Sequence, residues 1–163
     1  MNGEFQFPHT LVKVDAEHPN AVIRGNPNEA EVVDGKVSTI FNFDIPEWWK
    51  GKTCSLVFLF PAEDQLRSNW CKFEPTWGVA DFSVLSKPAD AATTFNNKGA
   101  VWEDFGEFNL VPGNSYVIKT HECPAGKTVG VEMSGRSKDG YGFDLSFFQD
   151  YNPAAIGLYV RAC

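Results

Sequence analysis

Three histidines, His9, His18 and His121, are the first residues to consider for acid–base or nucleophilic chemistry. They fall in separate segments, and the chain contains no Gly-x-Ser-x-Gly or His-Glu-x-x-His motif. His121-Glu122-Cys123 has the residue types of a metal ligand set, but a cysteine held in a disulfide cannot bind a metal ion. The histidines therefore predict neither a catalytic triad nor a metal site.

Carboxylates offer a second chemistry, because a glycosidase needs only two of them facing each other across a cleft. Asp44, Asp144 and Asp150 are the candidates, and each lies near a turn or on the polar face of a predicted strand, where solvated acids are usual. Asp139 and Asn152 extend this set toward a calcium loop, but no EF-hand spacing is present. We expect no enzyme, no metal and no cofactor; a small secreted glycan-acting hydrolase with a carboxylate pair is the alternative.

Tryptophans indicate binding. Trp48 and Trp49 lie between Pro46 and Gly51, and adjacent rings in a strand connection cannot both enter a core without a kink. At least one ring is therefore expected at the surface, where it can stack on a sugar or contact a protein. The alternative is that both rings plug the end of the fold. Trp70 and Trp77 flank Cys71 and form either a second aromatic spot or the cover of a disulfide.

Four cysteines are present, and none forms a CxxC or zinc-finger spacing. They are Cys54, Cys71, Cys123 and Cys163. An even number beside strand-like runs favours disulfides and an oxidising compartment, with buried free thiols in a cytosolic protein as the alternative. Three pairings are open; we prefer Cys54–Cys71 with Cys123–Cys163 and expect no free thiol.

The elements that must position these residues are short strands. Period-two alternation or short apolar runs predict strands at 10–15, 37–45, 53–60, 68–73, 79–85, 105–111, 116–120, 128–134, 141–147 and 156–162. Asp34-Gly35 predicts a hairpin before the second of these, and residues 87–100 read mainly as a loop. The 53–60 run is apolar on both faces and is expected to be packed on two sides. About ten or eleven strands without an amphipathic helix predict an all-β fold: an antiparallel, jelly-roll-like β-sandwich stapled by disulfides.

Composition narrows the partners. The chain of 163 residues is expected to form one domain, residues 1–163, with a core that contains Phe41, Phe43, Leu56, Phe58, Val129, Val131, Phe143, Leu145 and Leu158. A formal charge of −7 disfavours nucleic acid and anionic membranes, and no apolar run is long enough for membrane insertion. The opening MNGEFQFPHT lacks a signal-peptide pattern, so Met1 either opens a cytosolic protein or was added to a trimmed mature domain; the cysteines favour the second.

Several phrases, in order, resemble one known family. They are FDIP (43–46), GKTCSLVFLFP (51–61), TTFNN (93–97), VPGNSYVI (111–118), ECPAGKTV (122–129) and FFQDYNPAAIGLYVRAC (147–163). Together they resemble the But2 C-terminal domain, found mainly in secreted and cell-surface fungal proteins, over residues 8–163. Cys71 and the segment 70–77 depart from the family pattern.

The resemblance implies an extracellular β-rich module without an established catalytic mechanism. We therefore expect a secreted fungal domain, in the extracellular space or cell wall, that binds a wall glycan or a host or cell-surface protein through Trp48, Trp49, Trp70 and Trp77. By analogy with other small secreted fungal proteins, it is a candidate elicitor of plant defence.

Overall fold

The computed structural model describes residues 3–66, 69–74, 77–136, 142–152 and 154–163. Its regular elements are strands and two single-turn 3-10 helices, η1 (Glu47–Trp49) and η2 (Glu63–Gln65). The strands are β1 (Glu4–Gln6), β2 (Thr10–Asp15), β3 (Glu29–Val33), β4 (Val37–Asp44), β5 (Thr53–Phe60), β6 (Cys71–Glu74), β7 (Gly78–Leu85), β8 (Val101–Leu110), β9 (Asn114–Glu122), β10 (Thr128–Arg136), β11 (Asp144–Phe148) and β12 (Gly157–Ala162). In this described part of the chain, no helix is long and apolar enough to cross a membrane.

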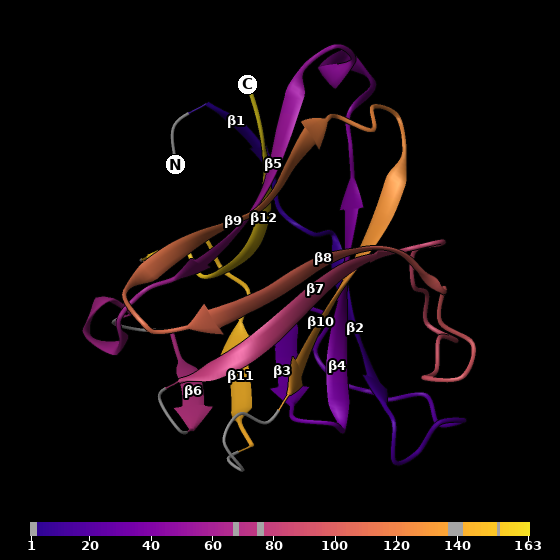
Figure 1. Cartoon of the computed structure of the whole chain (residues 1–163), viewed down its shortest axis with the longest axis vertical. Helices are drawn as coiled ribbons and strands as arrows, with labels where there is room; N and C mark the ends of the chain where they lie inside the picture. The colour runs from indigo at the N-terminus through magenta and orange to yellow at the C-terminus, as the bar shows by residue number, and fades with distance from the viewer. Residues whose placement is uncertain (1–2, 67–68, 75–76, 137–141, 153) are drawn as a thin grey trace.

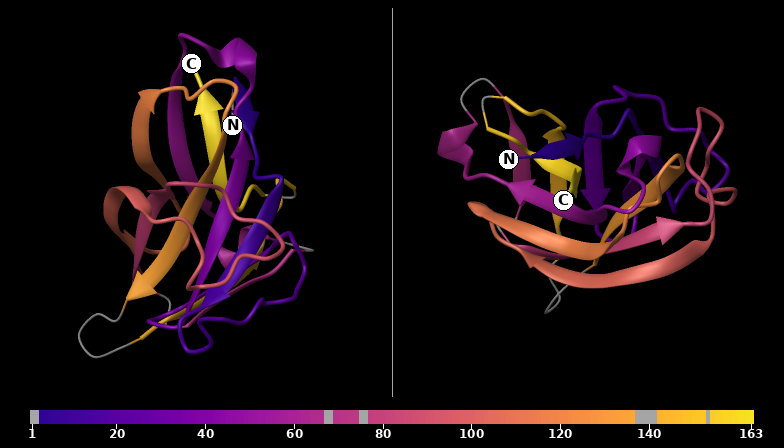
Figure 2. Two further views of the ribbon diagram at one scale, coloured as in Figure 1. Left: turned by 90° about the vertical axis from the view of Figure 1, so that its right-hand side faces the viewer. Right: turned by 90° about the horizontal axis from the view of Figure 1, so that it is seen from above.

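The strands form two antiparallel sheets that pack face to face (Figures 1 and 2). The smaller sheet has the order β1-β12-β5-β9. The larger has the order β6-β11-β3-β4-β10-β7-β8, and β2 pairs with β4 beside this path. The predicted all-β antiparallel sandwich is confirmed. The edge strands β8 and β9 belong to different sheets but run along the same side of the molecule (Figure 2).

The core lies between the sheets and is rich in aromatic rings. Phe58 sits at its centre, with ring centroids 5.5 Å from Phe60, 5.8 Å from Phe82 and 5.8 Å from Phe147. Every residue predicted for the core belongs to one continuous cluster; Val129 is half-buried at its margin and the other eight are buried. The period-two pattern therefore identified the inward faces correctly.

The strand that is covered on two sides is β4 and not β5, which corrects the sequence prediction. In β5 the side chains alternate strictly, and Val57 and Leu59 remain half-exposed on the outer face. In β4, Ile40 is fully buried on the outer face of the sheet, where it packs with Val14 and Leu85. The sequence alone gave no sign that another segment would cover this face.

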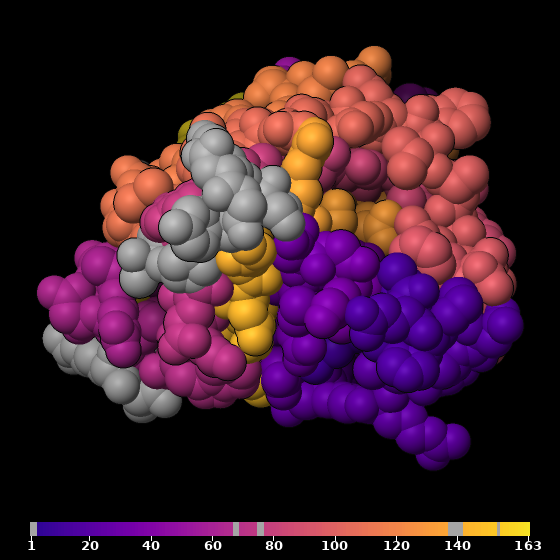
Figure 3. Space-filling view, turned by 60° about the horizontal axis from the view of Figure 1, so that its bottom comes forward, coloured from indigo at the N-terminus to yellow at the C-terminus, as the bar shows by residue number. Residues whose placement is uncertain are grey.

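The cover is the 86–100 segment, and the expectation that residues 87–100 are mainly loop is confirmed. Asn42 of β4 donates its side-chain amide to the carbonyl of Ala89 (2.7 Å) and accepts from the Ala89 N–H (3.0 Å). The segment also contacts the N-terminal loop, where the Asn96 N–H donates to the Pro19 carbonyl at 2.9 Å. Figure 3 shows the two segments side by side on the surface.

Other strand boundaries moved by a few residues. The Asp34-Gly35 hairpin joins β3 to β4 as predicted, with Gly35 at φ 64°. Strand β8 begins four residues before the predicted position 105, at Val101. Ser68 and Tyr141, predicted starts of two strands, lie outside the described residues, and β1 was not predicted.

The disulfide pairing differs from the one we preferred. Cys54 and Cys123 form a bridge with a Cα–Cα distance of 4.8 Å. The β5–β9 register pairs Cys54 with His121 and Thr53 with Glu122, and this brings the next residue, Cys123, close to Cys54. Cys71 lies on β6 at the far edge of the other sheet, and Cys163 follows β12; both are free thiols. The predicted pairs Cys54–Cys71 and Cys123–Cys163 and the predicted absence of free thiols are therefore wrong.

Candidate binding groove between the sheets

A groove of about 440 Å³ opens between the two sheets on the side where β8 and β9 meet. Its inner wall is made of apolar side chains from both sheets. These are Ile45, Leu56, Val84, Val131 and Val160, together with Cys54 of the disulfide. All but Val84 are buried, so the groove leads from the surface into the core. A groove of this size and polarity is typical of a ligand or partner site.

Charged groups surround the opening. Glu103 of β8 forms an ion pair with Lys119 of β9 at 3.0 Å, which links the two sheets across the rim. Lys87, Glu122 and Lys127 also lie on the rim, and none of them has an ion pair within the described residues. The rim therefore offers charges of both signs around an apolar interior.

Trp102 is the most exposed large apolar side chain of the described residues, at 79%. It lies at the mouth of the groove, beside Phe105. The Phe105 ring lies 6.4 Å from the His121 ring and 5.9 Å below the Lys119 ammonium, so its position is fixed from β9. Trp102 and Phe105 together form an aromatic lip of the groove, in which the Trp102 indole is exposed. An exposed indole beside a concave apolar surface is the kind of anchor that dominates binding interfaces.

Trp48 and Trp49 share the turn η1 but have opposite environments. Trp49 is 1% exposed and Trp48 is 70% exposed. The Trp49 side chain hydrogen-bonds Glu4, whose pKa is lowered mainly by its hydrogen bond from Lys52. The expectation that at least one ring is exposed is confirmed. Trp49, however, is a plug of the core and cannot present the exposed face that we expected of the pair.

Trp70 and Trp77 flank β6 at the opposite edge of the larger sheet from β8. They are 43% and 36% exposed. Because β6 lies at the bottom of Figure 1 and η1 at the top, these rings do not share a surface with Trp48. Cys71 lies between these two tryptophans in the sequence. Burial, and next the charge of Glu63, raise the pKa of its thiol to about 12, so this thiol stays protonated.

The model of the family described as the ubiquitin 3 binding protein But2 C-terminal domain matches residues 6–153. The chain belongs to the But2 C-terminal domain family. No curated protein matches the sequence.

The carboxylates of this But2 domain that the sequence suggested for catalysis are dispersed. Asp44 pairs with His9 at 2.8 Å, and Asp144 pairs with Lys72 at 3.4 Å. Asp150 accepts from the backbone N–H groups of the two residues that follow it. Asp139 lies outside the described residues. Within those residues, no group of three potential ligands could hold a metal ion, and the cysteine of His121-Glu122-Cys123 is in the disulfide.

A carboxyl pair that the sequence did not reveal lies on β7 and β8. Burial, and then a hydrogen bond and charge from Asp104, raise the pKa of Asp81 to about 6. The pKa of Asp104 is lowered, first by the hydrogen bond with Asp81 and then by one from the Gly106 N–H. The two carboxyls are in direct contact, whereas the pair of a glycosidase is separated by about 5 Å or more. Neither residue lines the groove.

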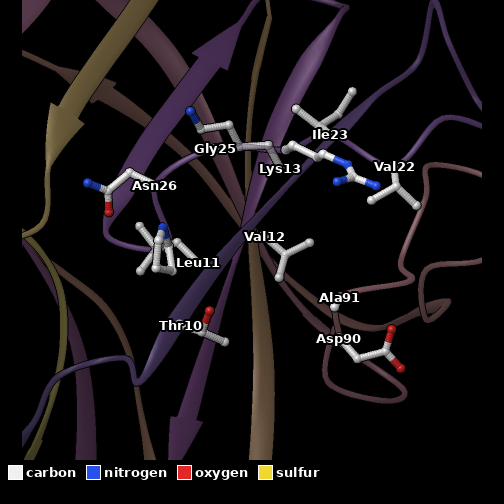
Figure 4. Close-up of a pocket in the computed structure, with 12 residues that line it drawn as sticks. Thr10, Leu11, Val12, Lys13, Val22, Ile23, Gly25, Asn26, Asp90 and Ala91 are labelled. Atoms are coloured by element: carbon white, nitrogen blue, oxygen red, sulfur yellow. The ribbon is translucent and has the colours of Figure 1, made fainter.

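A second depression, of about 460 Å³, follows β2 (Figure 4). Its walls are the 22–27 segment, with Val22 and Ile23, and the 86–100 segment, with Asp90 and Ala91. Figure 4 shows Val12 at its centre. Although its volume is slightly larger, it lies on the outside of the larger sheet and has no exposed aromatic ring. The groove at Trp102 is therefore the stronger candidate.

Proposed function

We propose that this But2 domain is a non-catalytic extracellular binding module and that it holds a protein partner at the Trp102 groove. One observation carries the proposal: an indole that is 79% exposed stands at the mouth of an apolar groove of about 440 Å³. A buried apolar floor suits an aliphatic or aromatic side chain of a partner, and the indole can cover that side chain as it enters.

A protein is favoured over a glycan at this position for two reasons. Sugar rings stack on flat exposed aromatic faces, whereas the floor here is formed by branched aliphatic side chains inside a groove. In addition, the family is described as a binding protein of a ubiquitin-type partner, which supports protein recognition in general. The identity of that partner does not transfer to this chain, because a disulfide is expected outside the reducing cytosol.

The extracellular part of the proposal rests on the Cys54–Cys123 bridge, whose two residues are buried in the core cluster. Such bridges persist in secreted proteins and at cell surfaces. We place the domain at the fungal cell wall or in the surrounding space, where a host receptor that recognises it would make it an elicitor.

The absence of catalysis is part of the proposal and has its own support. The carboxyl pair of Asp81 and Asp104 is in direct contact, so no sugar ring fits between the two groups. Around the groove, Glu103 is neutralised by Lys119, and the His121 ring lies 2.8 Å from the Glu122 carbonyl oxygen. These contacts hold the side chains at the mouth of the groove in place.

A wall glycan is the second candidate partner, at a different place. Trp48 is 70% exposed on a turn that projects from the end of the molecule (Figure 1), and the buried Trp49 fixes that turn. A single rigid indole face is what stacking on a sugar ring requires.

Capture from fungal culture filtrate and from host extracellular fluid tests both candidates. We expect the immobilised wild-type domain to retain a protease-sensitive partner, and Trp102→Ala to reduce its retention at least tenfold. Phe7→Ala is the matched control, because this ring is 61% exposed and does not line the groove. Equal capture by Trp102→Ala and wild type would contradict the proposal. A glycosidase-sensitive partner that is lost with Trp48→Ala would instead establish the second candidate.

A further inference from the structure

The two walls of the Trp102 groove carry different charges at its mouth. Strand β7 is antiparallel to both β8 and β10, so the end of β7 and the starts of β8 and β10 lie at the same end of the larger sheet. Lys87 follows β7, Trp102 lies at the start of β8 and Lys127 precedes β10, and all three line the groove. Glu122 lies at the end of β9, in the wall formed by the smaller sheet. The exposed indole therefore shares its side of the mouth with two lysines.

No ion pair neutralises these two lysines. Most lysines and arginines of the described residues form ion pairs; those that do not are Arg24, Lys50, Lys87, Lys127 and Arg161. The acids that line the groove are Glu103, which is paired with Lys119, and Glu122 on the opposite wall. On a protein with a formal charge of −7, the wall beside Trp102 is therefore locally positive.

Two further acids lie near Lys127 in the fold, but neither lines the groove. Asp44 pairs with His9 at 2.8 Å and accepts a hydrogen bond from the Thr128 hydroxyl at 2.7 Å. Glu47 packs with its carboxylate against Gly126, so closely that a Cβ atom at this glycine would collide with it. The lysine ammonium groups at the mouth thus have room for a carboxylate from another molecule.

The main chains of both lysines are held in place, although their side chains are exposed. A Cβ atom at Gly99 would lie 2.9 Å from the Lys87 nitrogen, and one at Gly130 would lie 3.3 Å from the Lys87 carbonyl oxygen. Glycine at both positions lets the backbone pack tightly around Lys87. The Lys127 carbonyl accepts from the Ile45 N–H at 2.9 Å. Two cations are thus presented from fixed positions, and charge-assisted hydrogen bonds to a carboxylate are the strong ones.

We propose that the protein partner binds through a segment that combines an apolar side chain with an acidic one. The apolar side chain enters the groove under Trp102, and the carboxylate, one or two residues away, pairs with Lys87 and Lys127. This rests on the proposed function and names the chemistry of the segment that the groove selects. Apolar burial supplies most of the affinity, whereas the charge complementarity supplies specificity.

A library of random displayed heptapeptides is the first probe. Peptides are selected on the immobilised wild-type domain, and those that also bind Trp102→Ala are removed. We expect the selected sequences to carry Asp or Glu within two positions of a large apolar residue. The same selection on the Lys87→Gln/Lys127→Gln variant should lose this preference for acids. Selected sequences that are neutral or basic beside the apolar residue would overturn the inference.

Fluorescence anisotropy with the leading peptide measures the contact. Lys87→Gln/Lys127→Gln should weaken binding about fivefold, a modest loss because exposed ion pairs are weak. The matched control Lys50→Gln/Arg161→Gln removes the same charge outside the groove and should change binding by less than about twofold, since distant exposed charges are screened by salt. Changing the peptide acid to its amide should weaken binding to wild type equally, but should not weaken binding to the groove variant further, because the ion pair is already absent there.

The outcomes separate this inference from the proposed function. Equal losses with the groove variant and its control would mean that only net charge matters, and the contact with Lys87 and Lys127 would be wrong. If Trp102→Ala weakens binding at least tenfold and the groove variant does not weaken it, the groove is the binding site but the acidic contact is wrong. If no selected peptide depends on Trp102, this inference is wrong, and capture of the natural partner decides the proposed function by itself.

Discussion

The Trp48–Trp49 turn and the Trp102 groove both carry a highly exposed indole, but they differ in what lies beneath it. Trp48 lies on a 3-10 turn whose other tryptophan fills the core, and it does not line the groove. Trp102 stands beside a groove whose inner wall is buried aliphatic surface. An exposed indole by itself offers a partner one face for stacking. An exposed indole beside a concave apolar floor can, together with that floor, remove a whole side chain of the partner from water. The difference separates a platform for a sugar from an anchor site for a protein.

The largest effect is expected within the turn. Trp49→Ala should lower the free energy of unfolding by about 3–5 kcal/mol, because it removes a buried aromatic ring and leaves a cavity. Trp48→Ala should change it by less than about 0.5 kcal/mol, as a surface substitution. Denaturant unfolding of both variants measures the contrast. Two strongly destabilised variants would show that Trp48 also packs, and the platform would have to be abandoned.

The disulfide of the groove is next. Replacing Cys54 and Cys123 together by alanine should cost about 2–4 kcal/mol, since the bridge closes a sequence separation of 69 residues. The matched control replaces Cys71 and Cys163, which are free, and should cost far less. Thiol titration of the denatured, unreduced wild type should find two thiols. If no thiol is found, all four cysteines are in two disulfide bridges. If four thiols are found, the Cys54–Cys123 bridge is absent and the support for an extracellular location is lost.

The smallest effect concerns Asp81, behind the β8 wall of the groove. Its folded pKa of about 6 lies above the ordinary 3.8, so its protonated form stabilises the fold below about pH 4. That contribution is lost as the pH rises through about 6. Asp104, whose pKa is lowered, contributes in the opposite sense and loses its contribution below about pH 4.

Asp81→Asn should therefore stabilise the protein at pH 7.5 by up to about 1 kcal/mol, since solvent screens this half-buried pair. At pH 4 the change should be close to zero. Thermal melting of wild type and variant at the two pH values gives the comparison. A variant that is less stable than wild type at pH 7.5 would mean that the Asp81 charge is compensated by Arg136.

The inward faces of this fold could be predicted from sequence because burial in a sandwich follows period two. Phe58 and Leu145 illustrate this, since each alternates with more exposed neighbours in a short window. The cover of β4 could not be predicted in the same way. It depends on the 86–100 segment, which contacts Ile40 and Asn42 across a long stretch of chain. The disulfide likewise depended on the β5–β9 register, which no local pattern encodes.

The candidate site was the harder part. Trp48-Trp49 attracts attention because two rings are adjacent in sequence, although their environments in the fold are opposite. Trp102 was missed because bulges in β8 interrupt the alternation around it, and the strand was expected to start at 105. Trp102 is a candidate binding residue because residues of six other strands or strand ends line the groove beside it. A tryptophan followed directly by two acids, Glu103 and Asp104, is the one signal that the sequence offered.

The most direct test of the central claim follows the indole N–H resonances of the five tryptophans during titration with the purified protein partner. Single Trp→Phe variants assign the resonances. We expect the Trp102 resonance to shift or broaden at substoichiometric partner, while those of Trp48, Trp70 and Trp77 stay within experimental error. A response from Trp48 or Trp70 with an unchanged Trp102 would contradict the assignment of the groove as the binding site.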